Sequence, residues 1–193
     1  HEASSFGIVH VEGDGLVADF VEKPSDPPEM PDRPGYSLAS MGNYIFDADF
    51  LMTALKELAD SEGGGTDFGK HIIPAHLHNR RTYAYDFATN RLPGEPEGKP
   101  TYWRDVGTLD SFYEANMDLR SPDPALNLYN QSWPLRTAET PNPPAKFVFD
   151  EIGRRGQAVQ SVVSEGCIVS GGSVRNSVLG KNVFVHSFAE VED

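Results

Sequence analysis

Hydrophobic and polar residues alternate near the N-terminus in a pattern that is typical of short β-strands. Residues 6–11 predict one strand, Glu12-Gly13-Asp14-Gly15 predicts a hairpin turn, and residues 16–21 predict the returning strand. A third apolar run covers residues 36–46, and Gly42 inside it indicates a bulge or a close approach of the backbone to a ligand. The pattern therefore predicts a small β-layer at this end of the chain.

Helical periodicity follows. Asp47 is placed to cap a helix with apolar residues at helical spacing, and Asp67 precedes a second helical segment that runs to Leu77. Residues 81–88 alternate with period two (Tyr83, Tyr85, Phe87) and predict a strand, and residues 109–119 predict a third helix. The chain up to residue 120 therefore reads as one α/β domain.

The pattern changes again after residue 120. Residues 121–157 are rich in Pro, Asn and Ser without a sustained period, and we interpret them as a connector. From residue 158 to 193, branched apolar residues recur every six positions with small residues between them, which is the signature of a parallel β-helix (Val162, Ile168, Val174, then Val178 and Phe184). This segment supplies about two coils, fewer than the roughly three repeats expected for stability, so we expect that it is truncated or capped by another chain.

Composition limits the classes of partner. The chain has 193 residues and a net charge of −13, without a long block of Lys or Arg, which argues against nucleic acid and against anionic membranes. No apolar run reaches the roughly 18 residues of a membrane span. Cys167 is the single cysteine, which excludes a disulfide framework and a thiolate metal cluster, and we expect it to be a small buried hydrophobe in a cytoplasmic protein.

The stretch Phe20-Val21-Glu22-Lys23-Pro24 is the first candidate for chemistry. Pro24 has no N–H and disfavours helix at Lys23, so the strand should end here, and ligand sites of open α/β sheets lie at strand ends. Lys23 offers a charge for a phosphate, and Glu22 can accept hydrogen bonds from hydroxyls. A surface Glu-Lys pair is the alternative reading.

Three further segments place polar residues among apolar elements: Ser40 with Tyr44, Asp67, and Trp103 with Asp105. Each has a structural alternative, because Ser40 could be ordinary strand filler, Tyr44 and Trp103 core aromatics, and Asp67 a helix cap. Asp105 follows Arg104, so its carboxylate should either pair with an arginine or bind a metal.

Together these segments resemble bacterial ADP-glucose pyrophosphorylases (glucose-1-phosphate adenylyltransferases). The resemblance covers nearly the whole chain in the right order. EKP alone is shared by many sugar-nucleotide pyrophosphorylases, whereas the other motifs are more specific. The motifs are FVEKP (20–24), SMGNYIF (40–46), DFGKHIIP (67–74), YWRDVGTLDSFYEANMDL (102–119), PPAKF (143–147) and SEGCIVSGGSVRNSVL (164–179).

The resemblance implies a fold and a reaction. The fold is α/β: the C-terminal part of a Rossmann-like nucleotidyltransferase domain (1–120), the connector (121–157) and the first coils of a left-handed parallel β-helix (158–193). The reaction is ATP + glucose 1-phosphate ⇌ ADP-glucose + pyrophosphate, in glycogen synthesis, by in-line displacement at the α-phosphorus. Positioning and charge neutralisation do most of the catalysis in such a reaction.

The resemblance also implies roles for individual residues. Lys23 should pair with the phosphate of glucose 1-phosphate, and Glu22 should accept bonds from the glucose hydroxyls. Asp105 should hold Mg²⁺ as one of two carboxylates, so that Lys23 and Asp105 are the catalytic pair. The remaining substrate-binding residues should line the sugar pocket: Ser40, Gly42, Tyr44, Asp67 and Trp103.

Two parts of the family pattern are absent. The family opens with a GGGxGTRLxPLT loop that holds the ATP phosphates, and Gly63-Gly64-Gly65 lacks its Thr-Arg partner and precedes a helix. The second metal-binding aspartate, expected before residue 1, is also absent. We therefore interpret the chain as an internal fragment that carries the sugar-phosphate half of the site and is by itself catalytically incomplete.

The family is usually a homotetramer with allosteric sites near the domain junction. Arg136 and Lys146 lie in that junction, where they could meet a sugar-phosphate or nucleotide effector or simply be solvated charges. Three other functions stay open: a related pyrophosphorylase that uses another nucleotide, a binding or regulatory module without catalysis, and a hexapeptide-repeat acyltransferase with His186 as its base. The last does not explain EKP or WRDVG.

Overall fold

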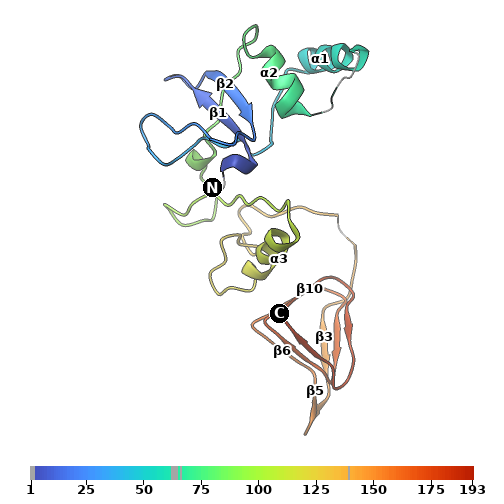
Figure 1. Cartoon of the computed structure of the whole chain (residues 1–193). Coiled ribbons are helices and arrows are strands. Elements are labelled where there is room, and N and C mark those ends of the chain that lie inside the picture. Colours follow the sequence, from blue (N-terminus) through green and yellow to red (C-terminus); the bar gives the residue numbers. More distant parts are fainter. Residues whose placement is uncertain (1–2, 62–64, 66, 139) are drawn as a thin grey trace. The chain divides into compact units, whose positions relative to one another are not determined.

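The computed structural model describes residues 3–61, 65, 67–138 and 140–193, and the chain divides into two compact units, His1–Phe87 and Ala88–Asp193 (Figure 1). Gly63 and Gly64, from the glycine run that lacks the features of an ATP-binding loop, lie outside the described residues. The first unit contains η1 (Ala3–Ser5), β1 (Gly7–Val11), β2 (Val17–Glu22), α1 (Ala48–Asp60), η2 (Phe68–Ile72) and α2 (Ile73–His76), and η3 (Phe87–Thr89) follows.

The strand–turn–strand prediction at the N-terminus is confirmed. β1 and β2 pair antiparallel, with Gly7 opposite Glu22. In the turn, Gly15 has φ +85°, a left-handed conformation that glycine adopts without steric cost. Along the outer edge of β1, Val9 N–H donates to Leu38 C=O (2.8 Å) and Ser40 N–H donates to Gly7 C=O (2.7 Å). The segment 38–40 therefore extends the hairpin by a short third row.

Helices pack on this hairpin because β2 presents an apolar face. Val17 and Phe20 of β2 form a buried cluster with Ile73 and Leu77. Asp47 begins α1 as predicted, since its carboxylate accepts a hydrogen bond from Phe50 N–H (2.9 Å). These contacts hold η2 and α2 against the strand that ends at Glu22.

The strand predicted over residues 81–88 is wrong. Only a single antiparallel bridge forms there, between Tyr83 and Leu16, and η3 begins at Phe87. Tyr83 and Tyr85 are 54% and 74% exposed. A segment with period-two alternation forms a strand only when a neighbouring strand offers several residues to pair with. Here the neighbour is Leu16, and the chain bends away from residues 81–88 at Gly15, so pairing ends after one bridge.

The second unit begins with loops around one helix, α3 (Leu109–Asp118). Thr108 caps α3 by accepting from Ser111 N–H (3.1 Å), and the Ser111 hydroxyl accepts in return from Thr108 N–H (3.1 Å). The helix predicted over residues 109–119 is thus confirmed.

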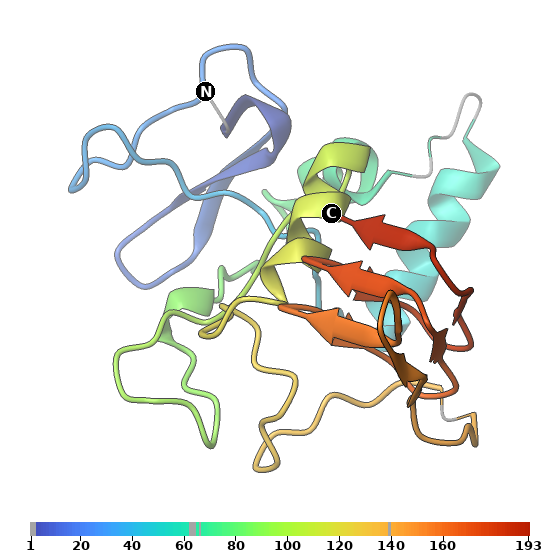
Figure 2. The ribbon, with the colours of Figure 1, turned by 90° about the horizontal axis from the view of Figure 1, so that it is seen from below.

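The C-terminal part forms a parallel β-helix. Its strands are β3 (Lys146–Val148), β6 (Gln157–Val159), β7 (Val162–Val163), β8 (Ile168–Ser170), β9 (Ser173–Arg175), β10 (Val178–Leu179), β11 (Phe184–Val185) and β12 (Glu190–Glu192). They stack as three parallel sheets in the orders β11-β8-β3, β12-β9-β6 and β10-β7. Figure 2 shows strands of successive coils side by side and pointing the same way.

The interior of the β-helix is apolar, but of the predicted repeat residues only Val174 belongs to the buried core. The other buried residues include Val169, Leu179 and Val185, each one position after a predicted residue, and Phe184 is 49% exposed. The fully buried residues include Val169 and Val174, which are 0% exposed. Cys167 is also 0% exposed, and its Sγ–H donates to Gly180 C=O (3.0 Å), so the prediction of a small buried hydrophobe is confirmed. Residues at the turns adopt left-handed conformations, for example Gly166 (φ +76°) and Asn182 (φ +62°).

Parallel pairing starts at Lys146, inside the segment 121–157 that we predicted as a connector, and not at residue 158. An antiparallel hairpin of β4 (Asp150–Glu151) and β5 (Arg154–Arg155) interrupts this first coil. The interruption hides the six-residue period in the sequence. Two sheets therefore contain three stacked strands, more than the two coils that we expected.

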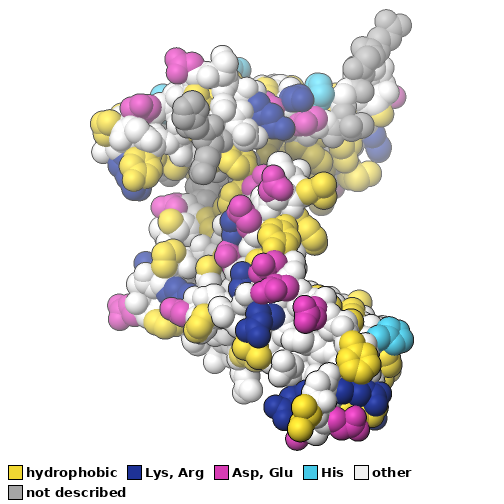
Figure 3. Space-filling view, turned by 60° about the horizontal axis from the view of Figure 1, so that its bottom comes forward, with side chains coloured by type: hydrophobic (Ala, Val, Ile, Leu, Met, Phe, Trp, Pro, Cys, Tyr) yellow, Lys and Arg dark blue, Asp and Glu magenta, His cyan; other side chains and the backbone are white. Residues whose placement is uncertain are grey.

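The surface mixes charge with apolar groups. Figure 3 shows Lys and Arg side chains interspersed with Asp and Glu on the face that it draws, with hydrophobic side chains between them. Among the described residues, the longest helices are too short and too polar to cross a bilayer.

Candidate functional site

Glu22 and Lys23 lie where the sequence predicted, at the end of β2. Glu22 is half-buried and points to the same face of β2 as Phe20, two residues earlier. A Cβ built on Gly69 of η2 would lie 2.7 Å from Glu22 Oε2, so this carboxylate reaches the first turn of η2. Within the part of the chain that the structure describes, the Glu22 carboxylate has no protein hydrogen-bond or ion-pair partner.

Lys23 has an unusual backbone. Its φ is +49°, and its N–H donates to Phe6 C=O (3.1 Å). The left-handed conformation costs a non-glycine residue about 1 kcal/mol, and residues held in this way concentrate at functional sites. The Lys23 side chain is exposed and available to an anion.

Ser40, Gly42 and Tyr44 form one small loop beside β1. Ser40 Oγ and Tyr44 Oη are hydrogen-bonded (3.0 Å), and Gly42 N–H donates to Ser40 Oγ (3.2 Å). Gly42 has φ +72°, a left-handed conformation that glycine adopts without steric cost. Because Ser40 N–H is bonded to Gly7, which pairs with Glu22, the two hydroxyls lie near the Glu22 end of the hairpin.

Asp67 begins η2 and joins the same cluster. Its carboxylate accepts from Lys70 N–H (3.0 Å), so its role as a helix cap is confirmed, and its side chain is exposed. The next residue, Phe68, stacks on Tyr44 with ring centroids 6.1 Å apart. We did not predict Phe68 as a site residue, although it directly follows Asp67 in the DFGK motif.

The hydrogen bond from Lys70 N–H lowers the pKa of Asp67 below its ordinary value of 3.8. A lowered folded-state pKa means that the charged form stabilises the fold above pH 3.8 and that this contribution disappears as pH falls further. We expect Asp67→Asn to melt below the parent chain at pH 5.5 and to approach it at pH 3.5. Thermal melts across this range measure the difference, and a gap that widens on acidification would contradict the assignment.

Trp103 and Asp105 belong to the second unit, whereas the six residues above belong to the first. Arg104, between them, pairs with two acids of α3: it bonds Glu114 (2.7 Å) and also Asp118. The alternative that Asp105 pairs with its neighbouring arginine is therefore wrong. Asp105 is exposed, without a hydrogen-bond or ion-pair partner among the described residues.

The donor set around Asp105 suits a metal only in part. No group of three or more His, Cys, Asp or Glu side chains within the described residues could hold a metal ion. Mg²⁺, however, usually binds through one or two carboxylates and keeps waters and substrate phosphates as its other ligands. One free, exposed carboxylate fits that role as a partial site.

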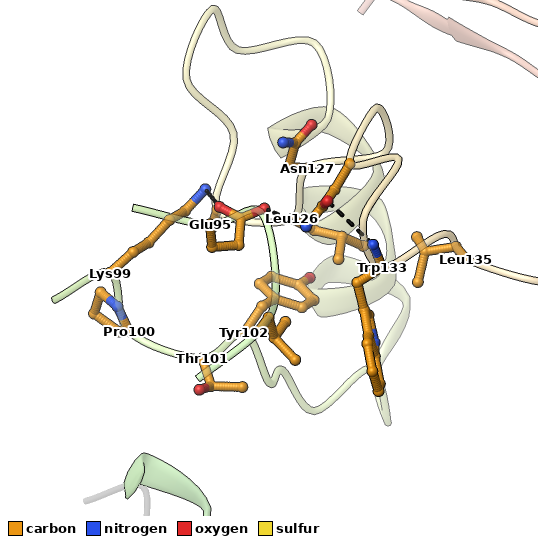
Figure 4. A pocket seen from close by; sticks show the side chains of 12 residues that line it. Glu95, Lys99, Pro100, Thr101, Tyr102, Leu126, Asn127, Trp133 and Leu135 are labelled. Atoms are coloured by element: carbon orange, nitrogen blue, oxygen red, sulfur yellow. Dashed lines mark hydrogen bonds and ion pairs between the residues drawn. The ribbon is translucent and has the colours of Figure 1, made fainter. Parts of the chain in front are cut away.

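A separate hollow lies between residues 92–102 and 125–135 (Figure 4). Glu95 and Lys99 form an ion pair at its edge (2.8 Å), and Asn130 donates to Pro93 C=O (2.8 Å) and to Glu95 Oε1 (3.3 Å). The Lys99 hydrogen bond holds the pKa of Glu95 below its usual value. These polar groups bind one another, and the hollow contains none of the predicted site residues.

Comparison with known proteins agrees with this architecture. Residues 1–121 match the nucleotidyl transferase family, and residues 143–193 match the GlmU-like, C-terminal hexapeptide family. The second match begins close to β3, in agreement with the early start of parallel pairing. The predicted order of a nucleotidyltransferase domain before a hexapeptide β-helix is confirmed.

Several curated relatives align with the whole chain at about half identity. Glucose-1-phosphate adenylyltransferase of Corynebacterium jeikeium is 52% identical over 193 residues, which are 100% of this chain and 46% of the relative. The proteins of the same name from Saccharophagus degradans and Methylococcus capsulatus are 51% and 50% identical, over 43% and 44% of their lengths. The chain spans a little under half the length of these relatives, and its first 121 residues identify it as a member of the nucleotidyl transferase family.

Proposed function

We propose that this chain carries the glucose 1-phosphate site of a glucose-1-phosphate adenylyltransferase. One observation carries the proposal: three separate segments meet at one end of the β1–β2 hairpin, because Ser40 N–H bonds Gly7 opposite Glu22, and the residues after Asp67 contact both Tyr44 and Glu22 (Phe68 and Gly69). The names of relatives that match the whole chain support the same activity. In bacteria this reaction feeds glycogen synthesis.

One part of the proposed site would bind the phosphate of glucose 1-phosphate, and the other would bind the hydroxyl groups of the sugar. Lys23 would neutralise the phosphate of glucose 1-phosphate, because a lysine ammonium is a compact charge with three donors. Glu22 would accept hydrogen bonds from sugar hydroxyls, with the Ser40–Tyr44 hydroxyl pair and Asp67 adding further polar contacts. Gly42 would allow the backbone to approach the sugar, and Trp103 would form an apolar wall.

The proposed reaction needs little proton transfer. A phosphate oxygen of glucose 1-phosphate attacks the α-phosphorus of ATP, a new P–O bond forms, and the bond to the β-phosphate breaks, releasing pyrophosphate. The attacking oxygen is already an anion, so a strong general base is unnecessary. Lys23 would catalyse by reducing the repulsion between two anionic substrates and by holding the attacking oxygen in place.

Asp105 would hold Mg²⁺ in this proposal. When bound, the ion would offset phosphate charge and polarise the phosphoryl oxygens. The ion pairs of Arg104 with α3 fix the backbone next to Asp105 and leave its carboxylate free. Asp105 is therefore the residue of the second unit that we assign to catalysis.

The test is selective binding of glucose 1-phosphate to the chain. Calorimetric titration should give an affinity at least about tenfold higher for glucose 1-phosphate than for inorganic phosphate, because the sugar adds hydrogen bonds to Glu22 and its neighbours. Glucose 6-phosphate, which presents its phosphate at the wrong carbon, serves as the matched competitor. Equal affinity for all three would rule out a sugar-recognising site.

Other features of these enzymes belong to the same proposal. They are ATP as the second substrate, a cytoplasmic location, homotetramer formation and an allosteric effector. Arg136 is exposed, and Lys146 begins β3 with an exposed side chain, so both are accessible to a sugar-phosphate or nucleotide effector. The division into 1–120, 121–157 and 158–193 stands as our proposal for the domains, with the first coil added from Lys146.

A further inference from the structure

Two buried glycines face the same carboxylate. Gly7 belongs to β1 and Gly69 to η2, which are far apart in the sequence. A Cβ built on Gly7 would lie 2.8 Å from Glu22 Oε2, and one built on Gly69 would lie 2.7 Å from the same atom. Both distances are shorter than van der Waals contact, so a side chain at either position would occupy the space of the carboxylate.

Backbone conformation does not explain these glycines. Eight glycines among the described residues have positive φ, where glycine is favoured, and Gly7 and Gly69 are not among them. Both positions would therefore accept alanine without backbone strain. The remaining reason for glycine is the space that a side chain would take from Glu22 and from the ring of Phe20.

We propose that Gly7 and Gly69 are positioning residues, which form a slot that sets where the Glu22 carboxylate meets a sugar hydroxyl. This inference rests on the proposed function, and it adds that recognition of the hexose part depends on two residues that need not touch it. A methyl group at Gly69 would displace the carboxylate from the slot and so from the position in which it would meet the sugar hydroxyl. Affinity for the sugar should fall, whereas the phosphate contact of Lys23 should be unaffected.

Gly69 gives the cleaner test of the two. The atom nearest to a Cβ at Gly7 is Phe20 Cζ (2.5 Å), part of the buried core, whereas the atom nearest to a Cβ at Gly69 is Glu22 Oε2, the end of a flexible side chain. Phe20 Cε1 lies 3.3 Å from the same Cβ, so Gly69→Ala should move the Glu22 carboxylate most and shift the Phe20 ring by only a few tenths of an ångström. Gly13→Ala is the matched control, because Gly13 lies in the turn of the same hairpin with nothing within 4 Å and without positive φ.

The experiment first follows the carboxyl resonance of Glu22 by NMR and then measures the affinity for glucose 1-phosphate. In the chain with ¹³C-labelled glutamate carboxyls, assigned with Glu22→Gln, Gly69→Ala should shift the Glu22 resonance and Gly13→Ala should not. Calorimetry should show roughly tenfold weaker glucose 1-phosphate binding for Gly69→Ala, with inorganic phosphate unchanged. In a Glu22→Ala background, Gly69→Ala should cause no further loss, since both changes act on one contact.

The outcomes separate the two ideas. An unmoved Glu22 resonance, or equal losses from Gly69→Ala with and without the Glu22 carboxylate, overturns the positioning role. If the parent chain fails to bind glucose 1-phosphate, the proposed function fails, and the Glu22 resonance alone then decides the slot. If Gly69→Ala does not fold, the double variant Gly69→Ala/Glu22→Ala should recover folding, because it removes the 2.7 Å contact with Glu22 Oε2 and leaves only the 3.3 Å approach to Phe20 Cε1. Failure of the double variant to fold also overturns the inference.

Discussion

Replacing Lys23 by glycine is expected to weaken glucose 1-phosphate binding about 10- to 100-fold without lowering the melting temperature. The loss corresponds to one hydrogen bond between charged groups, about 1.5–3 kcal/mol. Stability should hold because Lys23 has φ +49°. Glycine relieves a left-handed strain of about 1 kcal/mol, and this gain offsets the roughly 0.5–1 kcal/mol that glycine costs through a freer unfolded chain.

Two variants separate charge from backbone. Lys23→Asn removes the positive charge, so it should bind glucose 1-phosphate as weakly as the glycine variant. Because asparagine tolerates positive φ, this variant should melt at the same temperature as the parent. Lys56→Gln removes one exposed lysine of α1 and should leave binding intact. Calorimetry and thermal melts on the same samples give both quantities. Full affinity in Lys23→Gly would remove the phosphate role that we assign to this residue.

Gly156→Ala is expected to lower the free energy of unfolding by about 1–3 kcal/mol, the range of over-packed cores. A Cβ at residue 156 would lie 2.4 Å from Val169 O and 2.5 Å from Val148 O. Val169 O belongs to the next coil, and Val148 O belongs to the strand before the hairpin in the same coil. Both are backbone atoms, so neither can rotate away. The hairpin of β4 and β5 brings Gly156 against these carbonyls when the chain re-enters the first coil.

Gly180→Ala is the matched change in the same β-helix. No atom lies within 4 Å of a Cβ at Gly180, and its φ is not positive, so its stability should stay within about 0.5 kcal/mol of the parent. Urea unfolding followed by circular dichroism compares the two variants. Equal stability of the two variants would contradict the prediction, because it would mean that the backbone around Gly156 can move to make room for a methyl group without loss of stability.

Local signals in the sequence were sufficient for elements that depend on neighbouring residues. Asp47 and Thr108 begin helices because a side-chain oxygen and a nearby N–H suffice for a cap. The end of β2 before Pro24 follows from the chemistry of proline. The strand over residues 81–88 failed because pairing needs a partner edge, which no local pattern reports.

Periodicity and motifs were sufficient for the domain order, for the presence of a β-helix and for the residue types that we assign to the proposed sugar site, since local sequence encodes them directly. Long-range packing set how the Ser40–Tyr44 loop lies beside the strand end at Glu22, how Arg104 pairs with α3 and leaves Asp105 without a partner among the described residues, and how close Gly7 and Gly69 lie to Glu22 Oε2. These features depend on contacts between residues distant in the chain, and such contacts arise when buried faces pack together.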